Sequence, residues 1–92
     1  MIPSKTDNVV YRKVAGETIL VPVHGDVAKM KKIYILNNLG EFIWERIDGR
    51  KSVDEILDEI VENFEVTRDE ARKDLNEFIN SLKERNLVEE AP

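Results

Sequence analysis

The sequence predicts a single α+β domain in which a three-stranded antiparallel sheet is followed by three helices. The composition changes near Asn37. Before it, β-branched and aromatic residues occur in short runs between turn residues, and after it, leucines and charges recur at helical spacing. The connections between the strand runs are short, which favours an antiparallel meander because a parallel crossover needs about a dozen residues or more. With 92 residues and no cysteine, the chain depends on packing alone, so we expect one domain over residues 1–92 with its core at about 9–88.

Three runs predict the strands. Residues 9–14 and 18–23 are separated by a glycine turn and are expected to form a hairpin. The third run, residues 31–36, places its two isoleucines on one face and Tyr34 and Leu36 on the other. In a meander the middle strand is paired on both sides, so we expect the third strand to lie at an edge with free amides and carbonyls.

Helical periodicity and capping signals predict three helices over residues 37–49, 52–64 and 67–85. Ser52 and Glu55 have the spacing of a capping box, and the apolar residues that follow recur on one helix face. After the last helix, Leu87 and Val88 are expected to fold back onto the domain, and residues 89–92 are expected to fray.

The composition already narrows the possible classes of partner and compartment, before any motif is considered. The chain has 19 acidic and 14 basic residues, and this balance repels phosphate backbones and anionic lipid surfaces, so a protein or peptide partner is favoured. Without cysteine, disulfides and thiolate metal sites are excluded, and a reducing compartment fits. Because we see no signal-peptide stretch and no membrane span, we expect a cytoplasmic protein with no membrane partner.

The residue types that catalysis needs do not come together in the sequence. The single histidine, His24, stands beside a turn glycine, far in sequence from Ser52 and Ser81. The five carboxylates of the helix over 52–64 lie at polar positions, which is typical of a solvated helix face. The four glycines do not form a phosphate-binding loop. We therefore expect no enzymatic activity, no metal and no cofactor.

A hairpin beside two closely connected helices is also the layout of a winged helix, a fold that often binds DNA with its last helix. Residues 68–85 carry five basic and five acidic side chains, and the helix over 52–64 carries five acids and no base. Such charges suit a DNA backbone poorly. Only Lys29, Lys31 and Lys32 form a basic cluster. DNA binding therefore remains the alternative function, and we expect no nucleic-acid partner.

Several segments together carry a resemblance to a known family: Leu36-Asn37, Phe42-Ile43-Trp44-Glu45, Asp48-Gly49, Ser52-Val53-Asp54-Glu55-Ile56, Asp74-Leu75, Phe78-Ile79, Leu82 and Leu87-Val88. Over roughly residues 9–88 the chain resembles the PqqD family. That resemblance implies a winged-helix-like peptide-binding domain of pyrroloquinoline quinone (PQQ) biosynthesis or a related RiPP recognition element. Such a domain captures the leader of a ribosomally made precursor peptide and presents it to a radical SAM enzyme. The sequence departs from the family pattern at Asn86, where glycine is common, and at Gly40. We expect neither residue to touch the peptide-binding surface.

The resemblance further implies that the leader pairs with the edge of the third strand and lies in a groove beside the third helix. The candidate peptide-binding residues on the strand are Lys31, Lys32, Ile33, Tyr34, Ile35 and Leu36. On the helix we select one polar flank, made of Arg68, Arg72, Asn76 and Lys83, with Asp74 and Arg85 on the other flank as the alternative. The unshielded first strand also permits a homodimer.

Overall fold

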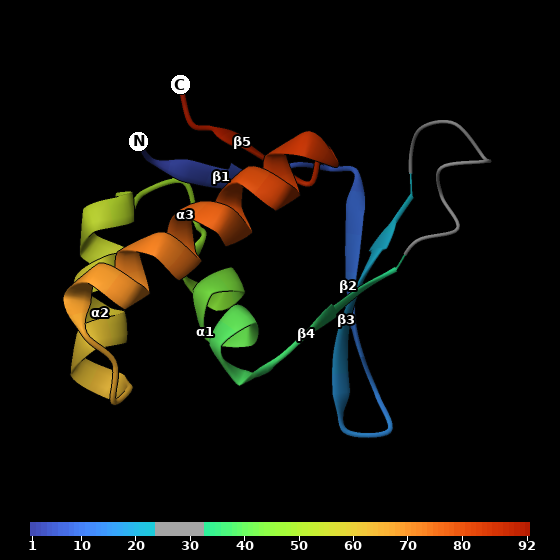
Figure 1. Ribbon diagram of the computed structural model, residues 1–92. Helices are drawn as coiled ribbons and strands as arrows, with labels where there is room; N and C mark the ends of the chain where they lie inside the picture. The colour runs from blue at the N-terminus through green and yellow to red at the C-terminus, as the bar shows by residue number, and fades with distance from the viewer. Residues whose placement is uncertain (24–32) are drawn as a thin grey trace.

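The computed structural model describes residues 1–23 and 33–92 (Figure 1). Over these residues the chain forms β1 (Pro3–Lys5), β2 (Val9–Val14), β3 (Glu17–Pro22), β4 (Tyr34–Leu36), α1 (Asn38–Arg46), α2 (Val53–Asn63), α3 (Arg68–Glu84) and β5 (Val88–Glu90). The predicted α+β class, with three antiparallel strands ahead of three helices, is confirmed. The predictions for His24, Lys29, Lys31 and Lys32 lie outside the described residues.

Strands β2, β3 and β4 form an antiparallel sheet with β3 in the centre, which is the predicted meander. β2 pairs with β3 over six residues, whereas β4 pairs with β3 over three. Leu20 of β3 lies between Tyr11 of β2 and Tyr34 of β4 and is fully buried. Because side chains alternate along a strand, Leu20 and its two neighbours mark the sheet face that points to the core.

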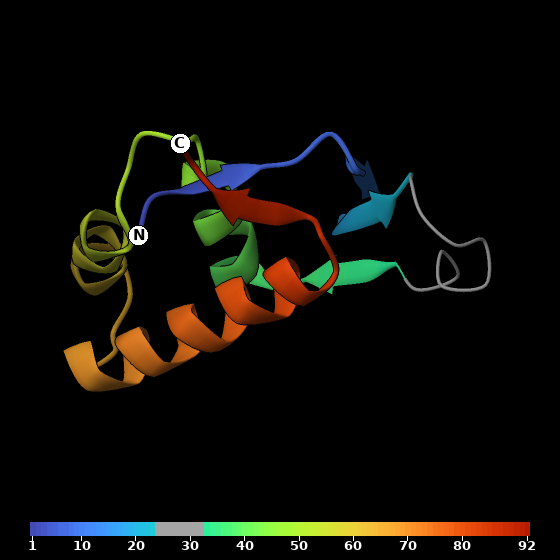
Figure 2. The same ribbon diagram turned by 90° about the horizontal axis from the view of Figure 1, so that it is seen from above.

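A second sheet, made by β1 and β5, joins the two ends of the chain (Figure 2). Lys5 lies opposite Val88, and Pro3 lies opposite Glu90. Leu87 and Val88 are buried, so the predicted return of this segment is confirmed, but the prediction of fraying is wrong at Glu89 and Glu90. Strands of three residues are too short to show periodicity, and their pairing across the whole chain has no local signal.

The helix boundaries follow local capping chemistry. Ser52 Oγ accepts a hydrogen bond from Glu55 N at 3.1 Å, and Glu55 Oε1 accepts one from Ser52 N at 3.0 Å, which confirms the capping box. α1 ends at Arg46 rather than near Gly49, because Ile47 turns into an extended conformation and is fully buried. Gly49 adopts φ +78 in the turn that follows, a conformation that favours glycine.

All three helices lie on one side of the β2–β3–β4 sheet (Figures 1 and 2). They supply most of the buried core, which consists of Leu20, Leu36, Ile43, Trp44, Ile47, Ile56, Leu57, Ile60, Ala71, Leu75, Ile79, Leu82, Leu87 and Val88. Among the described residues, no element of the chain packs on the opposite face of the sheet. Within the described part of the chain, one face of the sheet is therefore core and the other is surface.

Glu41 of α1 attaches the β2–β3 hairpin to the helices. The buried Thr18 hydroxyl donates to Glu41 Oε2 at 2.9 Å, and the Tyr11 hydroxyl and Lys13 Nζ each donate to Glu41 Oε1 at 3.4 Å. The hydrogen bond from Thr18, followed by the charge of Lys13, holds the pKa of Glu41 below its ordinary value. The attachment therefore depends on an ionised carboxylate.

Candidate functional site

The outer edge of β4 is open. β4 is paired with β3 on one side, and within the described part of the chain its other side takes no backbone hydrogen bond. Tyr34 and Leu36 point inward, while Ile33 and Ile35 are 49% and 58% exposed. The alternation predicted for the third strand is therefore present over residues 33–36. An edge of this kind can accept a further strand.

A groove lies beside this edge, between β4, the start of α1 and one side of α3. It consists of two hollows of about 270 and 210 Å³ that share Asn37, Gly40 and Phe78. Asp74 lines the first hollow, and Tyr34 lines the second. In Figure 2, β4 runs next to the C-terminal half of α3. The edge and the groove thus form one continuous surface.

Tyr34 holds β4 against α3. Its ring meets Phe78 edge-to-face with 5.9 Å between centroids, and its hydroxyl donates to Ser81 Oγ at 3.4 Å. The Arg85 guanidinium lies 4.8 Å from the centroid of the same ring. Phe78, Ser81 and Arg85 are spaced three and four residues apart, as is Asp74 before them, so these four residues form a single flank of α3.

The four predicted helix residues lie elsewhere. Arg68 forms an ion pair with Asp58 of α2, and Arg72 Nη1 lies 3.7 Å from Asp54 Oδ1 of the same helix. Asn76 and Lys83 are exposed, and neither lines the two hollows. At about 100° per residue these four residues occupy the flank of α3 opposite to Asp74 and Arg85. The structure brings the alternative flank to β4. The packing of α3 against α2 decides this orientation.

Asn37 and Gly40 line both hollows of the groove, although the sequence did not indicate either as a site residue. Asn37 Oδ1 caps α1 by accepting a hydrogen bond from Gly40 N at 2.7 Å. Gly40, which we expected to lie away from the peptide-binding surface, lines both hollows. A Cβ at this position would lie 3.2 Å from Asn37 Oδ1. Chain connectivity was the available signal, because a helix that starts one residue after an edge strand must begin beside that edge.

Asn86 stands where glycine is common in the family pattern, and its backbone adopts a conformation that glycine favours. It ends α3 with φ +60, in the left-handed region that asparagine tolerates better than most residues. Its carbonyl accepts hydrogen bonds from Thr6 Oγ1 at 2.7 Å and Asn8 Nδ2 at 3.1 Å. Asn86 thus belongs to the turn that leads into β5, and it lines neither hollow of the groove.

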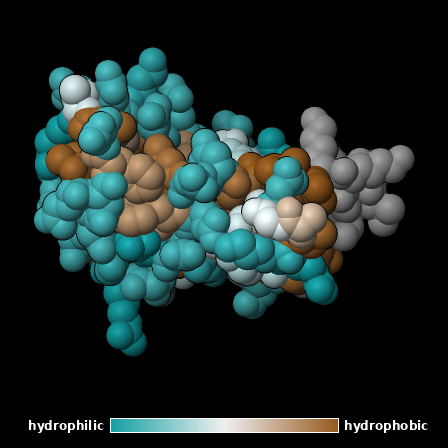
Figure 3. Space-filling view, turned by 90° about the horizontal axis from the view of Figure 1, so that it is seen from below, coloured by the Kyte–Doolittle hydropathy of each residue, from teal (hydrophilic) through white to brown (hydrophobic). Residues whose placement is uncertain are grey.

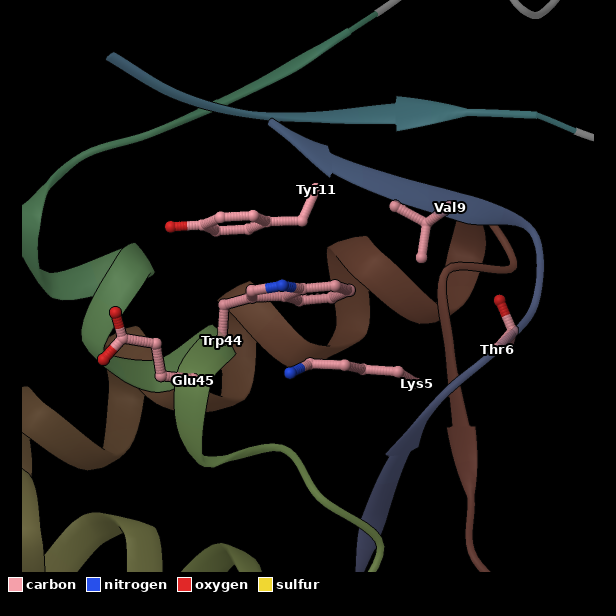
Figure 4. A pocket seen from close by; sticks show the side chains of 6 residues that line it. All are labelled: Lys5, Thr6, Val9, Tyr11, Trp44 and Glu45. Carbon is pink, nitrogen blue, oxygen red and sulfur yellow. The ribbon is translucent and has the colours of Figure 1, made fainter. Parts of the chain in front are cut away.

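A larger hollow of about 470 Å³ lies near the other edge of the sheet, where β2 faces α1 (Figure 4). The rings of Tyr11 and Trp44 face one another across it, and Lys5 lies on the other side of Trp44, with its Nζ 4.9 Å from the ring centroid. Burial lowers the pKa of Lys5, and the charges of Asp48 and Glu45 partly offset this effect. None of the predicted peptide-binding residues lines this hollow.

Over the described residues, no group of three or more His, Asp or Glu side chains is placed to hold a metal ion. In the same part of the chain, no helix combines the length and the apolar character needed to cross a bilayer.

Comparison with known proteins identifies the class of this binding domain. Residues 17–88 match the family described as coenzyme PQQ synthesis protein D (PqqD), and the chain belongs to that family. The resemblance drawn from the sequence is therefore confirmed. No match was found among proteins with a curated description.

Two solved structures share the fold. One is TbiB1 in complex with the TbiA(beta) leader peptide, with 26% sequence identity, a TM-score of 0.76 and 94% of each chain covered. The other is lasso peptide synthetase B1 complexed with the leader peptide, with 17% identity and a TM-score of 0.80. That comparison covers 97% of this chain and 99% of the other. At 17% identity the second likeness concerns the fold alone.

Proposed function

We propose that this protein is a binding adaptor that captures the leader of a ribosomally made precursor peptide by strand addition. The open edge of β4 beside the two-part groove carries the proposal. Membership of the PqqD family and the likeness to TbiB1, a protein solved with a leader peptide, support it. The comparisons lend no support to the DNA-binding alternative.

The backbone of the leader supplies register rather than affinity in this proposal. Each hydrogen bond to the β4 edge contributes about 0.5–1.5 kcal/mol, whereas ordering each leader residue costs about 1–2 kcal/mol. These two contributions roughly cancel. Net affinity must therefore come from leader side chains that enter the groove.

The groove favours a leader with an apolar residue between charged groups. Leu36, Ile43 and Phe78 supply apolar lining to the hollows. Asp74 and Arg85 lie eleven residues apart on α3, which places them about 16 Å apart along the helix axis. Their opposite charges at the two ends of the groove favour one direction of the bound peptide.

In this role the chain performs no reaction and needs no cofactor. It acts in the cytoplasm and presents the bound precursor to a modifying enzyme, for which a radical SAM protein of PQQ biosynthesis or a related pathway is our candidate. Of the predicted site residues, the proposal retains Ile33, Tyr34, Ile35 and Leu36. It adds Phe78, which lines both hollows, and Arg85, whose guanidinium lies over the Tyr34 ring.

The test is an NMR titration of the ¹⁵N-labelled protein with the leader segment of the precursor encoded beside its gene. Amide shifts are expected along residues 33–36 and along the flank of α3 that contains Phe78. A scrambled peptide of the same composition serves as the control. The proposal is rejected if the leader produces no shifts at these residues, or if the scrambled peptide produces the same ones.

A further inference from the structure

The outer face of the β2–β3–β4 sheet is an apolar surface that the described part of the fold leaves uncovered. Alternation from the buried Leu20 places seven strand residues on this face: Val10, Arg12, Val14, Glu17, Ile19, Val21 and Ile35. Five of the seven are β-branched apolar residues. In Figure 3, apolar surface gathers over the sheet, apart from a second apolar area over the helices.

The apolar residues of this face are open to solvent to different degrees: Val10, Ile19 and Val21 are half-buried, and the residues toward the margins of the face are exposed. Val14 is 53% exposed and Ile35 58% exposed, while Ile33 and Val23, beside the strand ends, are 49% and 36% exposed. The strand register makes the apolar residues of this face neighbours across the sheet, because Val10 lies opposite Val21 and Ile19 lies opposite Ile35. A contiguous, partly exposed apolar face of this kind is typical of an interaction surface.

We propose that this outer face is the surface on which the peptide-modifying enzyme docks, and this inference rests on the proposed function. The face is continuous with the β4 edge. A leader strand added there would extend the same sheet, with every second leader side chain on the outer face. A partner seated on the face would therefore touch the adaptor and the leader together.

The size of the face argues against a second copy of this chain as the occupant. The three strands contain six, six and three residues. With about 3.3 Å per residue and about 4.8 Å between strands, they cover a projected area of about 240 Å². A specific interface buries about 800 Å² on each partner. Two bare faces would therefore form too small a contact, whereas an enzyme that also covers the leader strand and its flanks gains the missing area.

Charge indicates the kind of enzyme surface that fits. The described residues 9–23 and 33–37 carry Arg12 and Lys13 against Glu17, whereas residues 38–92 carry eight basic and sixteen acidic side chains. The described strands are thus nearly neutral, and the helical part is acidic. On the outer face itself, Arg12 and Glu17 contribute one charge of each sign. The matching surface has an apolar centre and, at its rim, polar groups that pair with one charge of each sign.

The test uses Ile19→Glu, which places a carboxylate in the centre of the face. Ile19 lies opposite Arg12, so the new charge gains a cross-strand partner and the fold is retained. Val61→Glu is the matched control. Val61 is also a half-buried aliphatic residue, but it lies on α2. Thermal unfolding verifies that both variants are folded.

Leader affinity and affinity for the modifying enzyme encoded in the same gene cluster are measured separately on the full chain. Ile19→Glu is expected to weaken enzyme binding by about tenfold or more and to leave leader binding within about twofold, while Val61→Glu changes neither. Unchanged enzyme binding by Ile19→Glu overturns the inference and leaves the proposed function standing. Absence of leader binding by the unaltered protein rejects the proposed function instead.

Sedimentation of the unaltered protein and of Ile19→Glu tests whether a second copy of this chain occupies the face. A monomer in both cases agrees with the inference. If the unaltered protein is a dimer that Ile19→Glu converts to a monomer, with enzyme affinity retained, the face belongs to a second copy and the inference is overturned.

Discussion

Replacement of Phe78 by alanine separates the binding role of the groove from the stability of the fold. Phe78 lines both hollows and meets Tyr34 edge-to-face with 5.9 Å between ring centroids. A fully buried aliphatic side chain of the leader gains about 1.5–3 kcal/mol. With the largest apolar wall removed, we expect about half of that gain to be lost. The dissociation constant for the leader should then rise roughly four- to thirteen-fold.

Phe64→Ala supplies the matched control. Phe64 is half-buried like Phe78, and its ring also meets a partner edge-to-face, with 5.1 Å to the centroid of Phe42. Each substitution removes an aromatic pair worth about 0.5–1.5 kcal/mol beyond its buried area, so both should lower the free energy of unfolding by a similar amount. Only Phe78→Ala should weaken leader binding, because Phe64 does not line the groove hollows.

Isothermal titration calorimetry gives the leader affinity, and denaturant unfolding gives the stability of each variant. The reasoning is refuted if folded Phe78→Ala binds the leader as tightly as the unaltered protein does. It is equally refuted if Phe64→Ala weakens leader binding as much as Phe78→Ala does. The loss of affinity would then follow from lower stability and not from a lost contact with the leader.

Two further predictions concern charge. Arg85→Ala should weaken leader binding by roughly three- to tenfold, because the Arg85 guanidinium covers Tyr34 at the end of the groove. Arg72→Ala on the opposite flank should change leader binding by less than about twofold, and calorimetry with both variants checks this contrast. The lowered pKa of Glu41 means that its carboxylate stabilises the fold at neutral pH and that this contribution is lost as pH falls through the lowered value. Glu41→Gln should therefore be less stable than the unaltered protein at pH 7, with the difference shrinking below about pH 4, as measured by denaturant unfolding across that range.

Most of the fold was predicted from local signals in the sequence, namely helix caps and the alternation of side chains along strands. The capping box at Ser52 and Glu55 fixed the start of α2, and the alternation over residues 33–36 fixed which side of β4 faces the core. The chain ends were missed because β1 and β5 are three residues each and pair with one another across the whole chain. Pairing of that kind depends on closure of the fold, which no window of sequence contains.

The candidate site was predicted only in part for a similar reason. The open third strand followed from its place in the meander, and Tyr34 and Leu36 followed with it. The flank of α3 that borders the groove did not follow, because both flanks of that helix are polar and charged. Contact between α2 and α3 turns Arg68 and Arg72 toward α2. This leaves Phe78 and Arg85 beside Tyr34 of β4, and Asp74 beside the start of α1.

The sequence by itself determined the α+β class, the order of the three central strands and the three helices, and the family, because periodicity, caps and motif residues act over a few positions at a time. Tertiary structure alone decided the rotation of α3, the hollow at Gly40 and the apolar outer face of the sheet. Each of these depends on which surfaces remain after the helices have packed on one side of the strands, and that packing is a property of the whole chain.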